Sequence, residues 1–233
     1  MTPKTDPRGI EPVSELAGRL GMTFARIYPL LSALTHRSYV NEHPHTPEDN
    51  ERLEFLGDAV LDFIVGAWVY CRFPEMPEGD LTKMRSTLVC NEQLAEFARQ
   101  FDIGSAIRLG RGEASSGGRD REAILGSAFE AVIGAYYLEA GIEAVEQWMT
   151  PLLEGAEEKV LYQVQDPKSH FQERTQAARL GTPFYRVIGT SGPDHARMFD
   201  VEVVIGETVY GRGSGPSKQA AERAAAVDAL EKL

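Results

Sequence analysis

Residues 50–61 of the chain are Asn-Glu-Arg-Leu-Glu-Phe-Leu-Gly-Asp-Ala-Val-Leu, and the strongest structural signal in the sequence lies there. In a helix, Glu51, Glu54 and Asp58 stand at positions i, i+3 and i+7, so all three carboxylates lie on one face. Residues 53–70 are mostly apolar, which predicts a helix that borders a core. Like charges one turn apart repel, so we interpret this face as a site for a divalent cation. The simpler alternative is a solvated acidic stripe.

A second informative segment is residues 124–138, in which Glu130 is the only charged residue. A carboxylate in apolar surroundings is unfavourable unless it is protonated, paired with a cation or bound to a metal ion. A Glu that reaches the surface between small residues is the alternative. Because Glu54 and Asp58 are available elsewhere, the sequence predicts a shared Mg²⁺ site built from oxygen ligands.

The composition is that of a soluble globular protein with two domains. The chain has 233 residues, of which 42% are hydrophobic and 25% charged, enough for two modest cores. Cys71 and Cys90 are the only cysteines, which favours buried thiols in a reducing cytosol over a disulfide. The first twenty residues lack a signal-peptide core and the most hydrophobic run, residues 59–70, is too short to span a membrane. We therefore expect a cytoplasmic protein without a membrane anchor.

The pattern of residues predicts two different architectures. Residues 13–138 have helical periodicity throughout, with breaks at Gly21 and at residues 42–49, 73–79 and 110–118, and a further helix is expected at 142–161. After Pro167 the expected order is a helix at 169–180, a strand at 184–188, an alternating strand at 199–205, a strand at 208–212, and a helix capped by Ser217. The prediction is an all-α domain at 1–160, a linker at 161–167 and a small α+β domain (α-β-β-β-α) at 168–233.

The net charge of −11 is unusual for a protein that binds nucleic acid. Residues 1–165 contain 15 Lys and Arg against 26 Asp and Glu, whereas residues 166–233 contain nine of each. The whole excess of negative charge therefore lies in the part with the acidic helix. An acidic, metal-binding half joined to a neutral half is compatible with RNA binding, and it predicts weak, salt-sensitive affinity.

Residues 50–61 closely resemble the signature motif of the ribonuclease III family of double-stranded-RNA endonucleases. The similarity continues through residues 34–39 (LTHRSY), 83–89 (KMRSTLV) and 117–125 (GGRDREAIL), and it spans almost the whole chain. The resemblance implies a helical nuclease domain followed by a double-stranded-RNA-binding domain, and a homodimer that uses Mg²⁺, with Mn²⁺ able to substitute. It also implies hydrolysis by metal-activated water, which leaves 5′-phosphate and 3′-hydroxyl ends with a two-nucleotide 3′ overhang.

The same resemblance assigns roles to individual residues. Glu54, Asp58 and Glu130 match the carboxylates that bind metal and carry catalysis. Glu51 and Glu78 match further acidic residues in the active-site valley. Phe55 matches the aromatic residue that inserts into the partner subunit, which predicts an isologous dimer interface.

Ser127 departs from the family pattern, which usually has Asp at this metal-binding position. A neutral hydroxyl is a poorer ligand for a hard cation, so Mg²⁺ binding should be weaker. Three explanations remain open. In the first, water or a nearby acid such as Asp120 or Glu122 replaces the carboxylate. In the second, the site works at a higher metal concentration, and in the third, the chain is partly disabled.

In the C-terminal domain the resemblance implies shape-based recognition of A-form RNA. Gln172 and Glu173 would face one minor groove and His195 the next, while Lys218 at a helix N-terminus would contact the phosphates between them. Basic residues are few around Lys218. Arg212 and Arg223 are further candidates, although isolated arginines are more often solvated surface charges.

The predicted function is thus an endoribonuclease that processes ribosomal and other structured RNA precursors. The alternative is a double-stranded-RNA-binding protein whose nuclease site is weakened or inactive at Ser127. An inactive site would have no reason to keep its acids, so the presence of Glu51, Glu54, Asp58, Glu78 and Glu130 favours the enzyme over the binding protein. A small-molecule phosphohydrolase is a weaker third possibility, because it would not need an RNA-binding domain.

Overall fold

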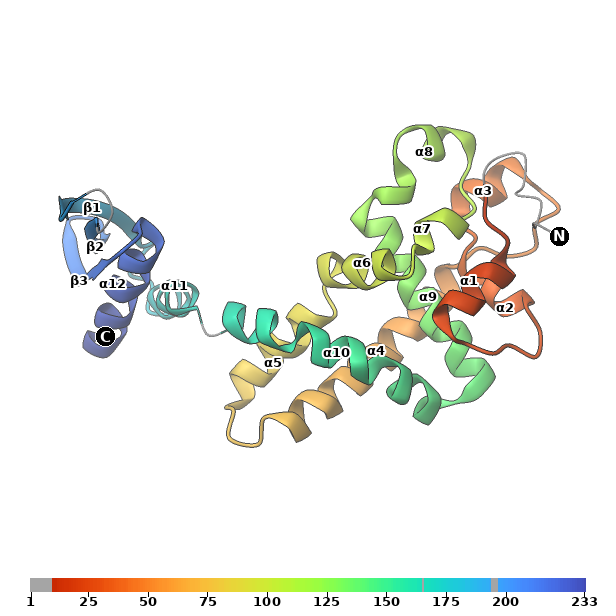
Figure 1. Ribbon diagram of the computed structural model, residues 1–233, viewed down its shortest axis with the longest axis horizontal. Helices are drawn as coiled ribbons and strands as arrows, with labels where there is room; N and C mark the ends of the chain where they lie inside the picture. Colours follow the sequence, from red (N-terminus) through yellow and green to blue (C-terminus); the bar gives the residue numbers. More distant parts are fainter. Residues whose placement is uncertain (1–9, 165, 194–196) are drawn as a thin grey trace. The chain divides into compact units, whose positions relative to one another are not determined.

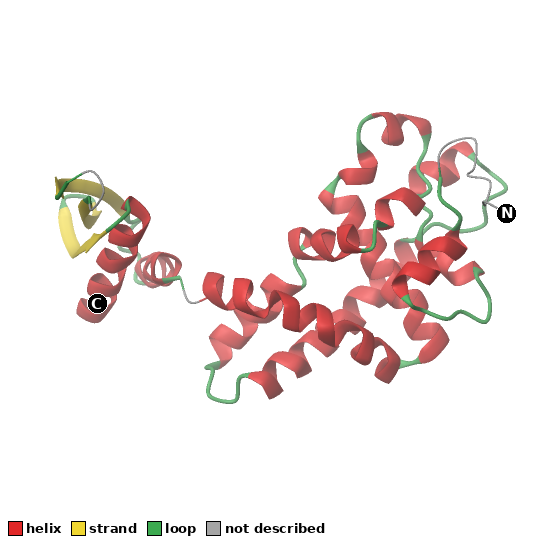
Figure 2. Cartoon of the chain, in the orientation of Figure 1, coloured by secondary structure: helices red, strands yellow, loops and turns green. Residues whose placement is uncertain are grey.

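The computed structural model describes residues 10–164, 166–193 and 197–233. The chain divides into two units, Met1–Val160 and Leu161–Leu233. The first unit is helical, and the second combines helices with a sheet (Figures 1 and 2). The elements of the first unit are α1 (Val13–Leu20), α2 (Tyr28–Ala33), α3 (Arg37–Glu42), α4 (Glu51–Arg72), α5 (Glu78–Leu88), α6 (Asn91–Gln100), α7 (Ile103–Ala106), α8 (Arg111–Ser115), η1 (Gly118–Asp120), α9 (Glu122–Ala140) and α10 (Ile142–Val164), whose last turn belongs to the second unit.

Helix α9 is the central element of the first unit. It packs against α2, α4, α6 and α7, and almost every residue from Ile124 to Ala135 is buried. Such a helix is apolar on all sides because neighbours cover it on all sides. Phe129, fully buried, contacts the rings of Phe97 and Trp148. The apolar run predicted as a core helix is therefore confirmed, with Glu130 as its one charged side chain.

Helices α4 and α9 approach so closely that their backbones are in contact. A Cβ atom added to Gly57 would lie 1.8 Å from the carbonyl oxygen of Glu130, and one added to Gly134 would lie 2.3 Å from that of Leu53. No side chain fits at either position without moving the helices apart. These two glycines therefore fix the place where the acidic face of α4 meets α9.

The connections of the first unit follow most of the predicted breaks. Gly21 ends α1 in the left-handed conformation, at φ 63°, and the loops before α4 and before α5 fall where they were expected. The predicted break at residues 110–118 is wrong in part, because α8 and the start of η1 lie within it. Short helical turns of this kind form in glycine-rich segments once the surrounding fold satisfies their ends.

The second unit has the predicted α-β-β-β-α order. Its elements are α11 (Pro167–Ala177), β1 (Phe184–Ser191), β2 (Met198–Ile205), β3 (Thr208–Gly215) and α12 (Lys218–Lys232). The strands form an antiparallel sheet in the order β1-β2-β3. Its core joins Phe171 and alternate residues of β2 to the small side chains of α12, as the period-two pattern requires. Ser217 caps α12 by accepting a hydrogen bond from the Ala220 amide at 3.1 Å.

Helices occupy much of the segment predicted as a linker. Helix α10 continues to Val164, and α11 begins at Pro167, where the Asp166 carboxylate accepts a hydrogen bond from the Ser169 amide at 3.3 Å. The predicted domain limits at 160 and 168 stay predictions. Within the described ranges, no helix is both long and apolar enough to cross a membrane.

Candidate active site

A shallow hollow of about 450 Å³ lies where α4 crosses α9. Its lining consists of Glu51, Glu54, Phe55, Asp58 and Glu130. The first four lie within two turns of α4, whereas Glu130 comes from α9, about 70 positions later in the sequence. The contact of the two helices at Gly57 and Gly134 brings them together.

Glu130 has the most perturbed electrostatic environment of this group. Burial, followed by the negative charges of Asp58, Glu54 and Asp62, raises the pKa of its carboxyl from the usual 4.5 to about 7. Glu130 is therefore protonated for part of the time at neutral pH. A positive ion placed in the hollow would reverse that preference, because it would stabilise the charged carboxylate.

Ser127 lies one turn before Glu130 on α9 and contacts α4. Its hydroxyl donates a hydrogen bond to Oε1 of Glu54 at 2.9 Å. Ser127 is not among the residues that line the hollow. The two acids that could replace a carboxylate at this position, Asp120 and Glu122, do not line it either, and Glu122 lies 3.8 Å from the guanidinium of Arg99.

The two accessory acids lie in different places. Glu51, exposed at the start of α4, lines the hollow and forms an ion pair with Arg37 at 3.0 Å. Glu78 is exposed at the start of α5, accepts a hydrogen bond from the Thr82 hydroxyl at 3.1 Å, and does not line the hollow. Within this chain the structure thus brings Glu51, but not Glu78, to the other carboxylates.

Asp62 was missed by the sequence reasoning. It stands one turn beyond Asp58 on the acidic face, adds to the negative potential at Glu130, and lies 3.8 Å from the guanidinium of Arg85 on α5. The continued i+4 spacing after Asp58 was the signal that could have identified it.

The donor set suits a hard divalent cation, because the hollow offers carboxylate oxygens and no nitrogen or sulfur ligand. Among the side chains that the structure describes, no three of His, Cys, Asp and Glu are close enough together to hold a metal ion as they stand. The residues therefore fit a metal ion by their chemistry and placement, and not as a ready-made coordination sphere.

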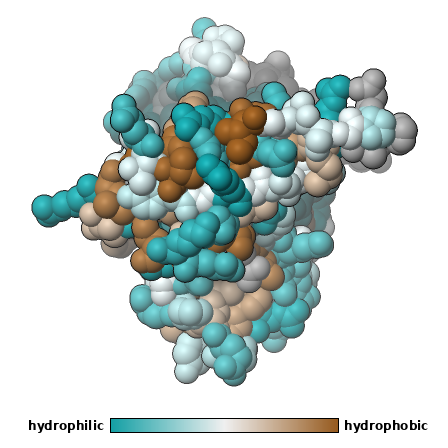
Figure 3. Space-filling model, turned by 90° about the vertical axis from the view of Figure 1, so that its left-hand side faces the viewer, coloured by the Kyte–Doolittle hydropathy of each residue, from teal (hydrophilic) through white to brown (hydrophobic). Residues whose placement is uncertain are grey.

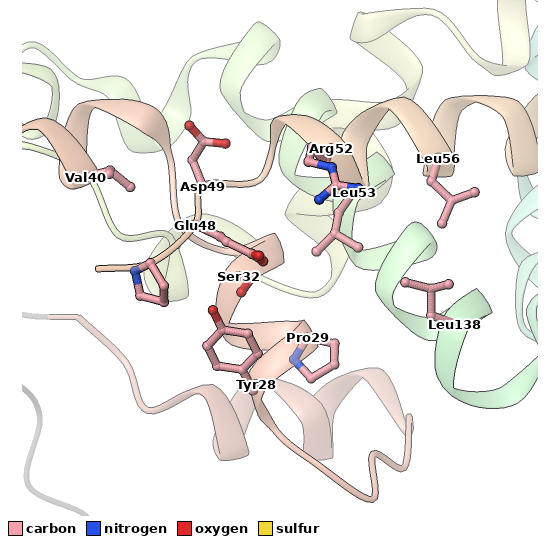
Figure 4. Close-up of a pocket in the computed structure, with 11 residues that line it drawn as sticks. Tyr28, Pro29, Ser32, Val40, Glu48, Asp49, Arg52, Leu53, Leu56 and Leu138 are labelled. Carbon is pink, nitrogen blue, oxygen red and sulfur yellow. The ribbon is translucent and has the colours of Figure 1, made fainter. Parts of the chain in front are cut away.

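A second, larger recess of about 580 Å³ lies beside the start of α4 (Figure 4). Apolar side chains form much of its wall, which also includes two acids and one arginine. Its lining consists of Tyr28, Pro29, Ser32, Val40, Pro47, Glu48, Asp49, Arg52, Leu53, Leu56 and Leu138. Nearby in α4, Phe55 is 79% exposed, an unusual state for a large apolar side chain. Sequence reasoning missed this recess because its wall comes from several separate segments.

The predicted RNA-contacting residues lie in the second unit. Gln172 and Glu173 are exposed on α11, and Lys218 is exposed as the first residue of α12. His195 lies outside the described residues. The two additional arginines are engaged within the unit: Arg212 lies 3.4 Å from a carboxylate oxygen of Glu202, and Arg223 stacks over the Tyr162 ring.

The surface of the second unit is mixed in character. On the face of the chain drawn in Figure 3, hydrophilic residues cover much of the surface and separate hydrophobic groups interrupt them. Exposed apolar side chains of the unit include Phe184 and Ile188, 65% and 51% exposed. Apolar and hydrophilic side chains therefore share the exposed surface of this unit.

Comparison with known proteins identifies the family. The sequence profile of the Ribonuclease-III-like family matches residues 29–155, more than half of the chain. The chain belongs to the ribonuclease III family. A second profile, the double-stranded RNA binding motif, matches residues 167–233, so this ribonuclease III also carries the family's RNA-binding unit.

Named relatives agree over nearly the full length. This ribonuclease III is 47% identical over 226 residues to the ribonuclease 3 of Roseiflexus sp. (strain RS-1). The alignment covers 95% of each of the two chains. It is 44% identical over 217 residues to that of Bacillus cereus (strain G9842), with 92% of this chain and 89% of the relative covered. The solved nuclease domain of ribonuclease III from Campylobacter jejuni matches 63% of this chain and 96% of its own, with 38% identity and a TM-score of 0.57.

Membership confirms the predicted fold and class of activity. The protein is a double-stranded-RNA endoribonuclease with a helical nuclease domain and a C-terminal RNA-binding domain. The family consists of metal-dependent nucleases.

Proposed function

We propose that this ribonuclease III cuts double-stranded RNA with Mg²⁺ held by Glu54, Asp58 and Glu130, and that Mn²⁺ can substitute. The observation that carries this proposal is the raised pKa of Glu130, to about 7, beside two further carboxylates in one hollow. Clustered acids of this kind are unfavourable without a cation and are typical of a functional site.

In the proposed reaction the residues of the chain hold and orient the reacting groups. When bound, a divalent cation lowers the pKa of water, polarises the scissile phosphate and offsets charge on the leaving 3′ oxygen. Glu130 must release its carboxyl proton before it can act as an anionic ligand. Glu51, paired with Arg37, contributes negative charge at the mouth of the hollow. Glu78, which does not line the hollow, would act elsewhere in the active-site valley that the family resemblance implies.

The products and substrates follow from the same proposal. Hydrolysis by activated water would leave 5′-phosphate and 3′-hydroxyl ends, and paired cuts would leave a two-nucleotide 3′ overhang. Ribosomal and other structured precursors are the proposed substrates, because the RNA-binding unit recognises duplex shape more than base identity. The proposed location is the cytoplasm, which agrees with two unpaired cysteines. The expectation that both thiols are buried is wrong, because Cys71 is exposed and Cys90 is half-buried.

We further propose that two copies form a homodimer in which Phe55 of each enters the partner. A solved structure of the ribonuclease III nuclease domain from Campylobacter jejuni shows structural flexibility in the region involved in dimer formation of that domain. Here Phe55 is largely exposed, and the apolar recess beside the start of α4 is an acceptor of suitable character. A dimer would supply two carboxylate hollows, one for each RNA strand.

In the RNA-binding unit, Gln172, Glu173 and His195 would contact the minor grooves, and Lys218 the phosphates between them. The exposed positions of Gln172 and Lys218 at the surface of α11 and α12 agree with this role. Arg212 and Arg223 are less suited, because each already has an acidic or aromatic partner.

The deciding experiment is a cleavage assay on long double-stranded RNA over a Mg²⁺ titration, with Glu130→Gln as the test variant. Glu146→Gln, an exposed acid on α10, is the matched control. We expect cleavage to fall at least about 100-fold in Glu130→Gln, with RNA binding and the control unchanged. Cleavage that persists in Glu130→Gln would refute the site assignment, and a parent that binds without cutting at any metal concentration would support the RNA-binding alternative.

A further inference from the structure

Ser127 occupies a position from which it can act on α4 as well as on its own helix. It precedes Glu130 by three residues, so both side chains project from the same face of α9. Its hydroxyl reaches across the helix crossing to Oε1 of Glu54 at 2.9 Å, a normal length for a hydrogen bond to a carboxylate.

Two observations argue against Ser127 as a metal ligand. Four acids and Phe55 line the hollow, and Ser127 does not. Its hydroxyl is directed at Glu54 by the hydrogen bond, and a neutral hydroxyl is a weaker ligand for a hard cation than the carboxylates that line the hollow. The contact that Ser127 does make is with a carboxylate that belongs to the proposed ligand set.

A hydrogen bond at Oε1 has two effects on Glu54. It restricts a side chain that would otherwise sample several rotamers, so less freedom is lost when the carboxylate is recruited to a cation. It also directs a positive dipole at one of several acids that repel one another, which stabilises the position of Glu54 beside Asp58 and Glu130.

We propose that Ser127 is a positioning residue, which holds Glu54 through this hydrogen bond and thereby sets the affinity of the acidic hollow for a divalent cation without binding the cation itself. The inference rests on the proposed function, since it presumes that Glu54 is a metal ligand. Through this hydrogen bond, Ser127 on α9 fixes the position of the Glu54 carboxylate on α4.

The test measures Mn²⁺ binding to the full-length protein by calorimetry and by electron paramagnetic resonance, without RNA. We expect Ser127→Ala to weaken binding about three- to tenfold through lost pre-organisation, and Ser127→Thr, which keeps the hydroxyl, to restore it. The number of ions bound should not change in either variant.

A double-mutant cycle separates positioning from direct ligation. If Ser127 acts through Glu54, Ser127→Ala should have no further effect on Mn²⁺ affinity in a Glu54→Ala background, which removes the acceptor of the hydrogen bond. An undiminished effect there would overturn the proposal in favour of direct ligation, and a Ser127→Ala protein that binds like the parent would overturn any role.

Ser127→Asp gives an independent check, because it places a carboxylate against Glu54 instead of a donor. We expect a lower melting temperature in EDTA and tighter Mn²⁺ binding, by about tenfold or more. An unchanged melting temperature in EDTA would contradict the stabilising hydrogen bond. If the parent and Glu130→Gln bound no Mn²⁺ at all, the proposed function itself would fail, a result distinct from a normal Mn²⁺ site that is insensitive to residue 127.

Discussion

Both units of this ribonuclease III depend on glycines that let two backbones touch, and they use the contact for different purposes. In the first unit, Gly57 and Gly134 let α4 and α9 meet, with Cβ positions 1.8 and 2.3 Å from backbone oxygens. In the second, Gly213 lets β3 meet α12, with its Cβ position 2.2 Å from the Ala225 amide nitrogen. The acidic hollow lies beside the contact between α4 and α9, whereas small core side chains surround the contact between β3 and α12.

The difference shows what each function requires of its surroundings. The proposed metal-dependent cleavage uses carboxylates that are crowded and partly dehydrated, and the close crossing of α4 and α9 provides this, as the pKa of Glu130, about 7, indicates. Duplex binding needs donors that project into solvent, and Lys218, the donor proposed here, is exposed at the start of α12. The close backbone contact therefore lies at the proposed site of one unit and in the core of the other.

Gly57→Ala should have the largest effect on stability. Its Cβ would overlap the Glu130 carbonyl, so α4 and α9 must separate, and we expect the first unit to lose about 3 kcal/mol or more. The two tryptophans of the chain, Trp68 and Trp148, both lie in that unit, so urea unfolding followed by tryptophan fluorescence reports on it alone. Gly66→Ala on the same helix is the control, because its Cβ would meet only the Arg85 side chain at 3.6 Å. Equal losses in the two variants would contradict the packing argument.

Gly213→Ala is the corresponding change in the second unit. We expect a loss of about 2 kcal/mol, since α12 lies at the edge of the unit and can shift outward more readily than α9. Far-ultraviolet circular dichroism should show an early loss of structure while the tryptophan transition stays in place. A shift of the tryptophan transition as well would show that the two units do not unfold separately.

Glu130→Gln should change the pH dependence of stability in EDTA. The folded-state pKa of Glu130, about 7, lies above its unfolded value, so this group favours the folded state below about pH 4.5 and that contribution is lost as the pH rises through 7. Relative to Glu130→Gln, the parent should lose about 1–2 kcal/mol over this range, less than the full shift implies because the carboxyl is partly exposed. Parallel pH profiles would mean that Glu130 has an ordinary pKa.

Lys218→Ala should produce the smallest change. One phosphate contact fewer should weaken double-stranded-RNA binding about three- to tenfold and reduce the slope of log affinity against log salt by about 1. Lys232→Ala is the control, because that lysine lies at the opposite end of α12 and is paired with Asp228. Binding in Ca²⁺, measured by fluorescence anisotropy, separates affinity from cleavage, and an equal loss in both variants would indicate non-specific charge attraction.

Sequence alone determined the fold class, because periodicity is a local property. The apolar run around Glu130, the alternation in β2 and the Ser217 cap each depend on neighbours within a few residues, and each was predicted. The acidic face of α4 was also evident from its spacing. The isolated charge of Glu130 in an apolar run, together with the family resemblance, paired Glu130 with that face.

Only the tertiary structure decided how those residues meet. The crossing at Gly57 and Gly134, the hydrogen bond from Ser127 to Glu54 and the contribution of Asp62 all join segments distant in sequence or depend on which helix face is covered. It also placed Glu78 outside the hollow and engaged Arg212 and Arg223 with partners of their own. Local spacing specifies which side chains share a face, whereas burial, pKa and contact depend on what packs against that face.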